Sequence, residues 1–289
     1  MCKEANGFFP FRMIMEDKRI LTIEDISCFG QCSLTVALPV ISACGIETVV
    51  IPSSVLSTHT TGFSGYTFRD LTEDIPRIAE HWKSLDLKFD AIYTGYLGSK
   101  KEVSYVIDIM ETFPALKIVD PAMADNGVLY PGFNEEYVQE MTRLCGIADI
   151  ILPNITEACM MTGVEYKTEY DDAYIITLLK KLHALGADTV ILTGVGFEKG
   201  MTGVMISIRG MVSYYEHRKI ERNCHGTGDV YASTFVGALM NGKDAYTAAK
   251  IAADFTVRCI DATLGDDAHW YGVKFERQIP ELIKAIQEN

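Results

Sequence analysis

The sequence predicts an α/β protein built as a three-layer α/β/α sandwich around a mostly parallel central sheet. Short apolar runs alternate with longer segments of helical periodicity, which is typical of parallel strands joined by helices. Most of these runs are bounded by Gly, Pro, Asp or Asn, the residues that commonly flank strands. The strand candidates come first and helices close the chain, and this order indicates one domain.

The expected elements follow this alternation along the chain. Strands are predicted at the short apolar runs, residues 19–23, 48–51, 91–94, 117–119, 149–152 and 189–193. Helices are predicted between them, where the pattern is helical, at residues 33–44, 75–85, 101–112, 135–145 and 172–185. Residues 203–208 and 212–216 are predicted to form a hairpin around Arg209-Gly210. Residues 230–240, 245–259 and 275–287 are predicted as closing helices.

Residues 1–17 are predicted to be a loose extension, and residues 18–289 a single domain. The extension contains Phe8, Phe9 and Phe11 but no apolar run long enough for a secretory signal. No apolar stretch approaches the roughly 20 residues that span a bilayer. The eight cysteines are scattered without a CxxC pair. We therefore expect reduced thiols and a cytoplasmic location, with no membrane partner.

The charge and the missing motifs exclude several functions. A net charge of −13 disfavours nucleic-acid binding, because affinity for phosphate backbones comes from clustered Lys and Arg. An acidic enzyme that handles a nucleotide needs metal ions and helix amides to supply positive charge. The sequence lacks the motifs of P-loop kinases, protein kinases, zinc hydrolases and serine hydrolases, and Gly194-Val195-Gly196 lacks the rest of a dinucleotide-binding pattern.

The segment His225-Gly226-Thr227-Gly228-Asp229 is the most informative one. Its glycines allow backbone amides to approach a phosphate, and the helix that follows adds unpaired N–H groups and a positive dipole end. Asp229 can accept a proton from an alcohol. The segment therefore indicates phosphoryl transfer to a hydroxyl. A glycine turn followed by helix-capping residues explains the same pattern without function.

Polar residues also follow other predicted strands, where ligands bind in open α/β sheets. Asp120 and Asp125 lie in a turn that suits a hard cation, although solvated turn aspartates look the same. Asn154 and Glu157 have the spacing of a capping box, and Glu157 could also serve a metal site. Thr193 and Gly194 follow another strand and offer a hydroxyl near where a nucleotide could lie, although an ordinary strand-ending turn looks the same.

Two amino-terminal segments complete this set. Asp25 and Ser27 follow the first predicted strand, where a carboxylate and hydroxyls could bind a small polar ring. Residues 57–63, which include His59 and Thr60, are too rich in hydroxyls to be predicted as core. A capped helix start and a surface loop are the alternatives without function.

Together these residues resemble the ribokinase-like vitamin kinases, and within them the pyridoxal kinases. The resemblance runs from about Arg19 to the carboxyl end, and its carriers are Gly226 to Asp229, Asp120-Pro121 with Asp125, Asn154 to Glu157, Thr193-Gly194, Tyr93-Thr94-Gly95-Tyr96 and His59-Thr60. It implies a ribokinase-like fold and a homodimer. It also implies ATP-dependent phosphorylation of the 5′-hydroxymethyl group of a B6 vitamer, which is pyridoxal, pyridoxine or pyridoxamine.

The resemblance implies a role for each matching residue. Asp229 matches the catalytic base, and Gly226, Thr227 and Gly228 match the anion hole that stabilises the transferring group. The implied metal residues are Asp120, Asp125 and Glu157, for Mg²⁺ and a neighbouring monovalent cation such as K⁺. The implied ATP contacts are Asn154, Thr193 and Thr227, and the implied substrate contacts are Asp25, Ser27, Thr60 and Tyr96.

Several residues depart from the pyridoxal kinase pattern, so the sequence does not decide which substrate is used. Asp25 stands where many pyridoxal kinases have a serine, and residues 25–30 are similar to a loop of the hydroxymethylpyrimidine kinases of thiamine synthesis. Leu152 replaces a common threonine and Ala124 a usual glycine. His59-Thr60 followed by Phe63 favours a B6 substrate. The alternatives are hydroxymethylpyrimidine kinase and a vitamin- or nucleotide-binding protein without catalysis.

Overall fold

The computed structural model describes residues 17–222 and 224–288. The predicted extension at residues 1–17 therefore lies almost wholly outside the described residues. The division of the chain into that extension and a single domain stays a prediction.

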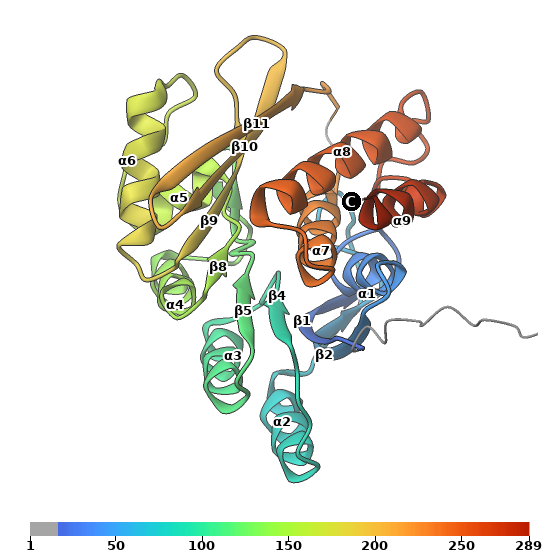
Figure 1. Ribbon diagram of the computed structural model, residues 1–289. Coiled ribbons are helices and arrows are strands. Elements are labelled where there is room, and N and C mark those ends of the chain that lie inside the picture. The colour runs from blue at the N-terminus through green and yellow to red at the C-terminus, as the bar shows by residue number, and fades with distance from the viewer. Residues whose placement is uncertain (1–16, 223, 289) are drawn as a thin grey trace, which may run out of the picture.

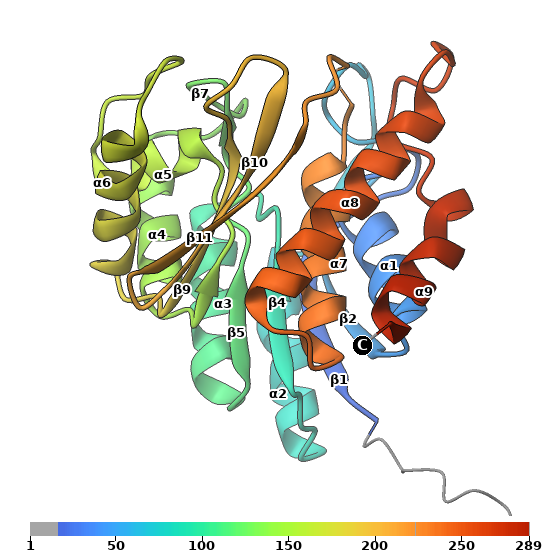
Figure 2. The ribbon, with the colours of Figure 1, turned by 45° about the horizontal axis from the view of Figure 1, so that its top comes forward.

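The described residues form a nine-stranded sheet between two layers of helices (Figures 1 and 2). Its strands, in spatial order, are β11 (Met211–Arg218), β10 (Met201–Ile208), β9 (Thr189–Val195), β8 (Ile150–Ile151), β5 (Leu116–Val119), β4 (Ala91–Thr94), β1 (Arg19–Ser27), β2 (Glu47–Leu56) and β3 (Phe68–Asp70). The pairs from β9 to β2 are parallel, whereas β3, β10 and β11 pair antiparallel at the two edges. The three-layer sandwich with a mostly parallel sheet is confirmed.

The helices connect these strands. They are α1 (Leu34–Ala43), α2 (Ile75–Ser84), α3 (Lys100–Thr112), α4 (Glu135–Gly146), α5 (Ile155–Thr162), α6 (Asp172–His183), α7 (Thr227–Met240), α8 (Ala245–Thr263) and α9 (Ile279–Gln287), with short 3-10 turns at Thr72–Asp74 and Glu276–Gln278. A small ribbon of β6 (Ala124–Asp125) and β7 (Val128–Leu129) follows β5. Several helices begin at a side chain that accepts a hydrogen bond from the first turn, including Ser99, Asn134, Asp171 and Asp244.

Alternating side chains on the strands divide the core into two parts. Leu21 and Ile23 of β1 pack with α2 to α6 on one face, whereas Ile20 lies in the cluster of α1, α7, α8 and α9 on the other. Strands buried on both faces read as continuous apolar runs, which is why β4 and β5 are recognisable in the sequence. This arrangement brings the carboxyl ends of the parallel strands to the same end of the sheet as the N-terminus of α7.

The main difference from the prediction is the length of β1. It continues from Ile23 through Glu24, Asp25 and Ile26 to Ser27, and its pairing with β2 shifts register between Glu24 and Ile26. A polar sequence predicts the end of a strand, but here the bulge turns these polar groups into the interior of the protein. Asp25 and Ser27 therefore belong to β1 itself and do not follow it.

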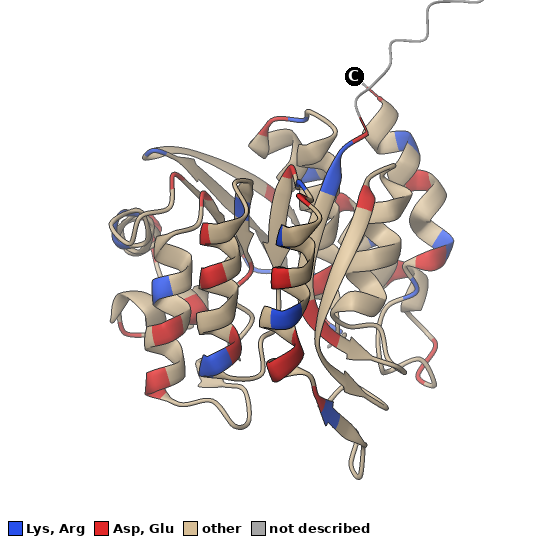
Figure 3. Cartoon of the chain, turned by 90° about the horizontal axis from the view of Figure 1, so that it is seen from below, with Lys and Arg blue, Asp and Glu red and all other residues tan. Residues whose placement is uncertain are grey.

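Charged residues are distributed over the outer helices. Figure 3 shows, from below, Lys and Arg interspersed with Asp and Glu along these helices. Lys101 pairs with Glu73, and Arg143 pairs with Glu140 within α4. Such exposed pairs contribute little to stability individually. In the part of the chain that the structure describes, no helix has both the length and the apolar character needed to cross a membrane.

Candidate active site

The glycine turn before α7 has the geometry of an anion-binding loop. Gly226 has a φ of 72° and precedes the helix, and a Cβ at this position would lie 1.7 Å from the carbonyl oxygen of Gln31. Only glycine fits that position, because the backbone there is left-handed and the backbone of Gln31, in the segment after β1, lies directly against it. Within the described residues, no side chain caps α7. Its first-turn amides are therefore available to an anion.

Asp229 lies in the first turn of α7, beside these amides. Burial raises the pKa of its carboxyl group to about 7, and the negative charge of Asp25 adds to this effect, while a hydrogen bond from the Ser33 backbone opposes it. A carboxylate that titrates near neutral pH has the basicity a general base needs at that pH. The position and the pKa of Asp229 both suit proton removal from an alcohol.

The end of β1 supplies a second carboxyl group to the same space. Asp25 is only 5% exposed, and its Oδ2 accepts a hydrogen bond from the Ser27 hydroxyl at 2.9 Å. Burial raises its pKa, whereas hydrogen bonds from Ser33 and Ser27 lower it. The negative charge of Asp25 adds to the rise in the pKa of Asp229. Burial raises the pKa of the Tyr96 phenol to about 12, and the Asp25 charge adds to that rise as well. The structure thus brings Asp25, Ser27 and Tyr96 to the side of the site near Asp229.

Glu24, which was not predicted as a site residue, also lies at this end of β1. Its side chain is fully buried, Oε1 accepts a hydrogen bond from the Thr22 hydroxyl at 2.8 Å, and Oε2 has no partner among the described residues. Burial, followed by the charge of Asp229, raises the pKa of Glu24 well above its usual range. Burial thus favours the protonated form of this carboxyl group, which lessens its repulsion from Asp229. Glu24 directly follows the apolar run of residues 19–23, and this position was its one signal in the sequence.

Asp120, Glu157 and Asp125 form a third acidic group beyond β5. Glu157 is 2% exposed, and its oxygens accept backbone hydrogen bonds from Asn154 at 2.8 Å and Met123 at 3.1 Å. Burial raises its pKa to about 7, with a smaller contribution from the charge of Asp125. Burial and the charges of Glu157 and Asp229 raise the pKa of Asp120. These carboxyl groups are therefore close enough to affect one another.

The oxygen donors suit Mg²⁺ in their chemistry. Asp120 and Glu157 are buried, whereas Asp125 is exposed at the end of β6. Buried carboxylates without a counter-charge are costly to ionise, and a hard cation with oxygen ligands relieves that cost. Throughout residues 17–222 and 224–288, however, no group of three or more His, Cys, Asp or Glu side chains is assembled closely enough to hold a metal by itself. A cation here would need oxygen atoms from the nucleotide as well.

The capping box at α5 is present. The Asn154 side chain accepts from the Glu157 amide at 2.9 Å, and its Nδ2 donates to the Ala124 carbonyl at 2.8 Å. Asn154 also forms a bridge with Thr193, so the ends of β8 and β9 lie together. The Asn154 side-chain amide is thus already hydrogen-bonded within the protein. Its contact with a nucleotide stays a prediction. Thr193 remains half-buried at the end of the sheet.

The loop after β2 contributes a buried histidine. His59 is 5% exposed and its Nε2 lies 3.0 Å from the Tyr271 carbonyl oxygen, whereas Thr60 next to it is exposed. The expectation that this segment is too polar for the interior is therefore wrong for His59, because other aromatic side chains cover the ring. In the described part of the chain, no hydrogen bond joins Thr60 to the carboxyl groups above.

The buried carboxyl groups predict an unusual dependence of stability on pH. The pKa values of Glu102, Glu157 and Asp229 are raised to about 7, from 4.5, 4.5 and 3.8 respectively. A group whose pKa is raised in the folded protein stabilises the fold fully at pH values below its pKa in the unfolded chain. This stabilisation is lost as the pH rises through the pKa of the group in the folded protein. We expect the thermal unfolding midpoint of the ligand-free protein to fall between about pH 5 and 8. Unfolding monitored by circular dichroism across this range is the measurement.

Glu24→Gln is the matched variant for that experiment. It removes one buried ionisable group, while the side-chain oxygen can still accept from Thr22. The decline with pH should become shallower, and the variant should be more stable than the wild type near pH 8. A midpoint that rises with pH in both proteins would contradict this view of the buried carboxyl groups.

Comparison with known proteins gives consistent matches. The family model of phosphomethylpyrimidine kinase matches residues 37–272. A candidate phosphomethylpyrimidine kinase from Bacteroides thetaiotaomicron is 34% identical, with a TM-score of 0.89 over 96% of both chains, and a second crystal form of it was solved with pyridoxal. Pyridoxal kinase from Lactobacillus plantarum is 31% identical, with a TM-score of 0.87 over 92% of this chain and 97% of that one.

A relative from thiamine synthesis also matches. The bifunctional thiamine biosynthetic enzyme TH1 of Arabidopsis thaliana is 27% identical over 277 residues, which is 90% of this chain. The alignment spans about half, 51%, of the plant enzyme. The similar proteins thus include both B6 and pyrimidine kinases.

Proposed function

Because this chain belongs to the phosphomethylpyrimidine kinase family, within the pyridoxal kinase-like part of the ribokinase superfamily, we propose that it phosphorylates a B6 vitamer. The phosphate donor is ATP, and the acceptor is the 5′-hydroxymethyl group of pyridoxal, pyridoxine or pyridoxamine. The observation that carries this proposal is Asp229 with a pKa of about 7 beside the uncapped amides of α7.

The chemistry follows from the positions of these groups. Asp229 takes the hydroxymethyl proton as the alcohol oxygen attacks the γ-phosphorus of ATP, and the bond to the β,γ-bridging oxygen breaks. The amides at Gly226, Thr227 and Gly228 hold the equatorial oxygens of the transferring group, where charge accumulates. Because these donors are fixed before the substrate arrives, little reorganisation is needed in the transition state.

Charge balance calls for cations. We assign Asp125 and Glu157 to Mg²⁺, and Asp120 with Thr193 to the neighbouring region where a monovalent cation such as K⁺ and the triphosphate lie. Bound cations would offset the charge of the triphosphate and of the buried carboxyl groups. Asn154 and Thr227 are the further ATP contacts in this proposal.

The vitamer ring belongs on the side of Asp25. Asp25 and Ser27 offer acceptor and hydroxyl groups to the ring, and Tyr96 and Thr60 border it in this proposal. Asp25 and Asp229 are near enough for their charges to interact, so one small alcohol can reach both. We also propose that the enzyme is a cytoplasmic homodimer.

A second candidate function is hydroxymethylpyrimidine kinase of thiamine synthesis. It is favoured by the description of the family model and by the match to the plant thiamine enzyme. His59-Thr60 and the B. thetaiotaomicron relative solved with pyridoxal favour the B6 substrate. A protein that binds these ligands without turnover is the third candidate, and intact Asp229 weighs against it.

The substrate is tested by comparing initial rates of ADP formation with Mg²⁺, K⁺ and ATP. The acceptors are pyridoxal, pyridoxine, pyridoxamine and hydroxymethylpyrimidine, each at several concentrations. We expect the highest kcat/KM with a B6 vitamer. If hydroxymethylpyrimidine alone supports turnover, the second candidate replaces the first, and if no acceptor does, the binding-protein alternative is favoured.

A further inference from the structure

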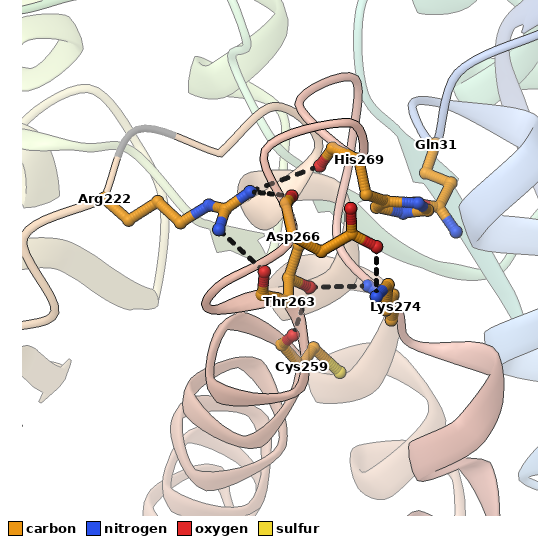
Figure 4. A network of polar contacts seen from close by, with 7 residues as sticks. All are labelled: Gln31, Arg222, Cys259, Thr263, Asp266, His269 and Lys274. Atoms are coloured by element: carbon orange, nitrogen blue, oxygen red, sulfur yellow. Dashed lines mark hydrogen bonds and ion pairs between the residues drawn. The ribbon is translucent and has the colours of Figure 1, made fainter.

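A loop far from α7 in the sequence lies against the entrance to that helix. Residues 264–274 connect α8 to the carboxyl-terminal turn, and Arg222 precedes the glycine turn. Figure 4 shows Arg222 reaching from its own segment to this loop. Its Nη1 donates to the Thr263 carbonyl at 2.7 Å, and Nη2 donates to the carbonyls of Asp266 at 2.8 Å and His269 at 3.4 Å.

The guanidinium group is well matched to these acceptors. Thr263 is the last residue of α8, and carbonyl groups at a helix C-terminus lack partners within the helix and carry partial negative charge. The planar fork of arginine holds its donors on separate nitrogens in a fixed geometry, so Nη1 and Nη2 can reach carbonyl oxygens of different residues at once, whereas the donors of lysine all lie on one nitrogen atom. Lys274 supports the same loop through its backbone, which donates to the Thr263 hydroxyl, and through its ammonium group, which pairs with Asp266.

The opposite side of the loop is attached to the segment that follows β1. His269 Nε2 lies 2.9 Å from Gln31 Oε1, and the Gln31 backbone amide donates to the Tyr271 carbonyl. The Gln31 carbonyl is also the atom that presses on Gly226. One residue thus touches both the loop and the anion-binding turn.

The loop presents aromatic side chains to the site. The Trp270 ring lies 4.5 Å from Phe63 and 6.3 Å from His225, and Tyr271 lies 4.6 Å from Phe29, measured between ring centroids. We call Phe29, Phe63, Trp270 and Tyr271 the aromatic wall. Trp270 and Phe29 remain 40% and 48% exposed within it. An aromatic face left partly open beside the anion-binding turn suits a planar ring.

We propose that Arg222 is a positioning residue that acts through residues 264–274 to place the aromatic wall for the ring of the acceptor alcohol. The inference rests on the proposed function, because it concerns the same acceptor. Arg222 itself does not touch the reacting atoms in this account. Loss of its three hydrogen bonds leaves the loop with the Lys274 contacts on that side and with the Gln31 and His59 contacts on the other.

The test replaces Arg222 by Met, which keeps most of the stem and removes all three hydrogen bonds. Arg209→Met, which loses only an exposed pair with Asp188, is the control. Because misplacement by about 1 Å can cost about 100-fold in rate, we expect kcat/KM for pyridoxamine to fall about tenfold or more, mainly through a rise in KM. kcat and the KM for ATP should change less, and Arg222→Lys should restore only part of the loss.

Fluorescence provides a readout that does not depend on turnover. The chain has two tryptophans, so Trp82→Phe leaves Trp270 as the only one. In this background, Arg222→Met should make Trp270 more accessible to acrylamide quenching, and pyridoxamine should protect it in the protein with Arg222 intact. Arg209→Met should leave quenching unchanged.

The outcomes separate this inference from the proposed function. Unchanged quenching and unchanged KM in Arg222→Met would overturn it, as would a fall in thermal stability alone without either effect. If Arg222→Met does not fold, the same two measurements on Arg222→Lys decide the matter. If the wild type phosphorylates no vitamer but Arg222→Met still exposes Trp270, the loop anchor stands and the proposed acceptor fails.

Discussion

Asp229→Asn is expected to lower kcat by about 10²–10⁴-fold while ATP still binds, because general base catalysis contributes an effect of that size. The amide of Asn is nearly the same size as the carboxyl group but cannot take the hydroxymethyl proton. Steady-state kinetics with a B6 vitamer and calorimetric titration with ATP are the measurements. Asp261→Asn, which removes a surface carboxyl group paired with Arg218, is the control.

The pH dependence of the wild type belongs to the same prediction. The base must be ionised, and the pKa of Asp229 is about 7. We therefore expect kcat/KM in the free enzyme to rise as pH increases through about 7. Because Glu157 has a similar pKa, saturating Mg²⁺ should be used in the assay. Near wild-type turnover of the Asp229→Asn variant would show that Asp229 is not the general base.

Gly226→Ala is expected to have the second large effect, on both stability and activity. Its φ of 72° disfavours a side chain, and the added Cβ would lie 1.7 Å from the Gln31 carbonyl oxygen. Backbone strain of this kind costs on the order of 1–3 kcal/mol before the clash is relieved. Relief requires the turn to move, which displaces amides of the anion hole, and loss of one such donor lowers kcat by about 10²–10³-fold.

Gly228→Ala is the matched stability control. It lies two residues away in the same motif, has no positive φ and would place its Cβ with nothing within 4 Å. Thermal unfolding should therefore show a large loss for Gly226→Ala and little change for Gly228→Ala. Equal losses in both variants would mean that the close approach of Gln31 does not define this turn.

The architecture could be predicted because residues that pack into the core on either face of the sheet recur at regular spacing in the sequence. Strands β4 and β9 are buried apolar runs, and the helices between strands repeat apolar residues at helical spacing. The capping box of Asn154 and Glu157 was also foreseeable, because it needs only three residues of spacing. Such features depend on residues close together in the sequence, so they can be predicted without knowledge of the tertiary structure.

Features set by tertiary contacts were not foreseen. β1 was expected to end at Ile23, but the structure carries it through Glu24, Asp25 and Ser27, whose polarity is stabilised by partners such as Thr22 and Ser33. The loop with Trp270 was not singled out either. Its place depends on hydrogen bonds to Arg222 and Gln31, more than 40 and 200 residues away in the sequence respectively. No periodicity or spacing encodes such contacts.

The most direct test of the account is the fate of the γ-phosphate of ATP, followed by phosphorus NMR in a mixture of protein, Mg²⁺, K⁺, ATP and pyridoxamine. We expect a new phosphomonoester resonance coupled to the two methylene protons of the 5′ carbon, formed in step with ADP and almost absent with Asp229→Asn. Release of inorganic phosphate without that ester, or ester formation that persists in Asp229→Asn, would contradict it.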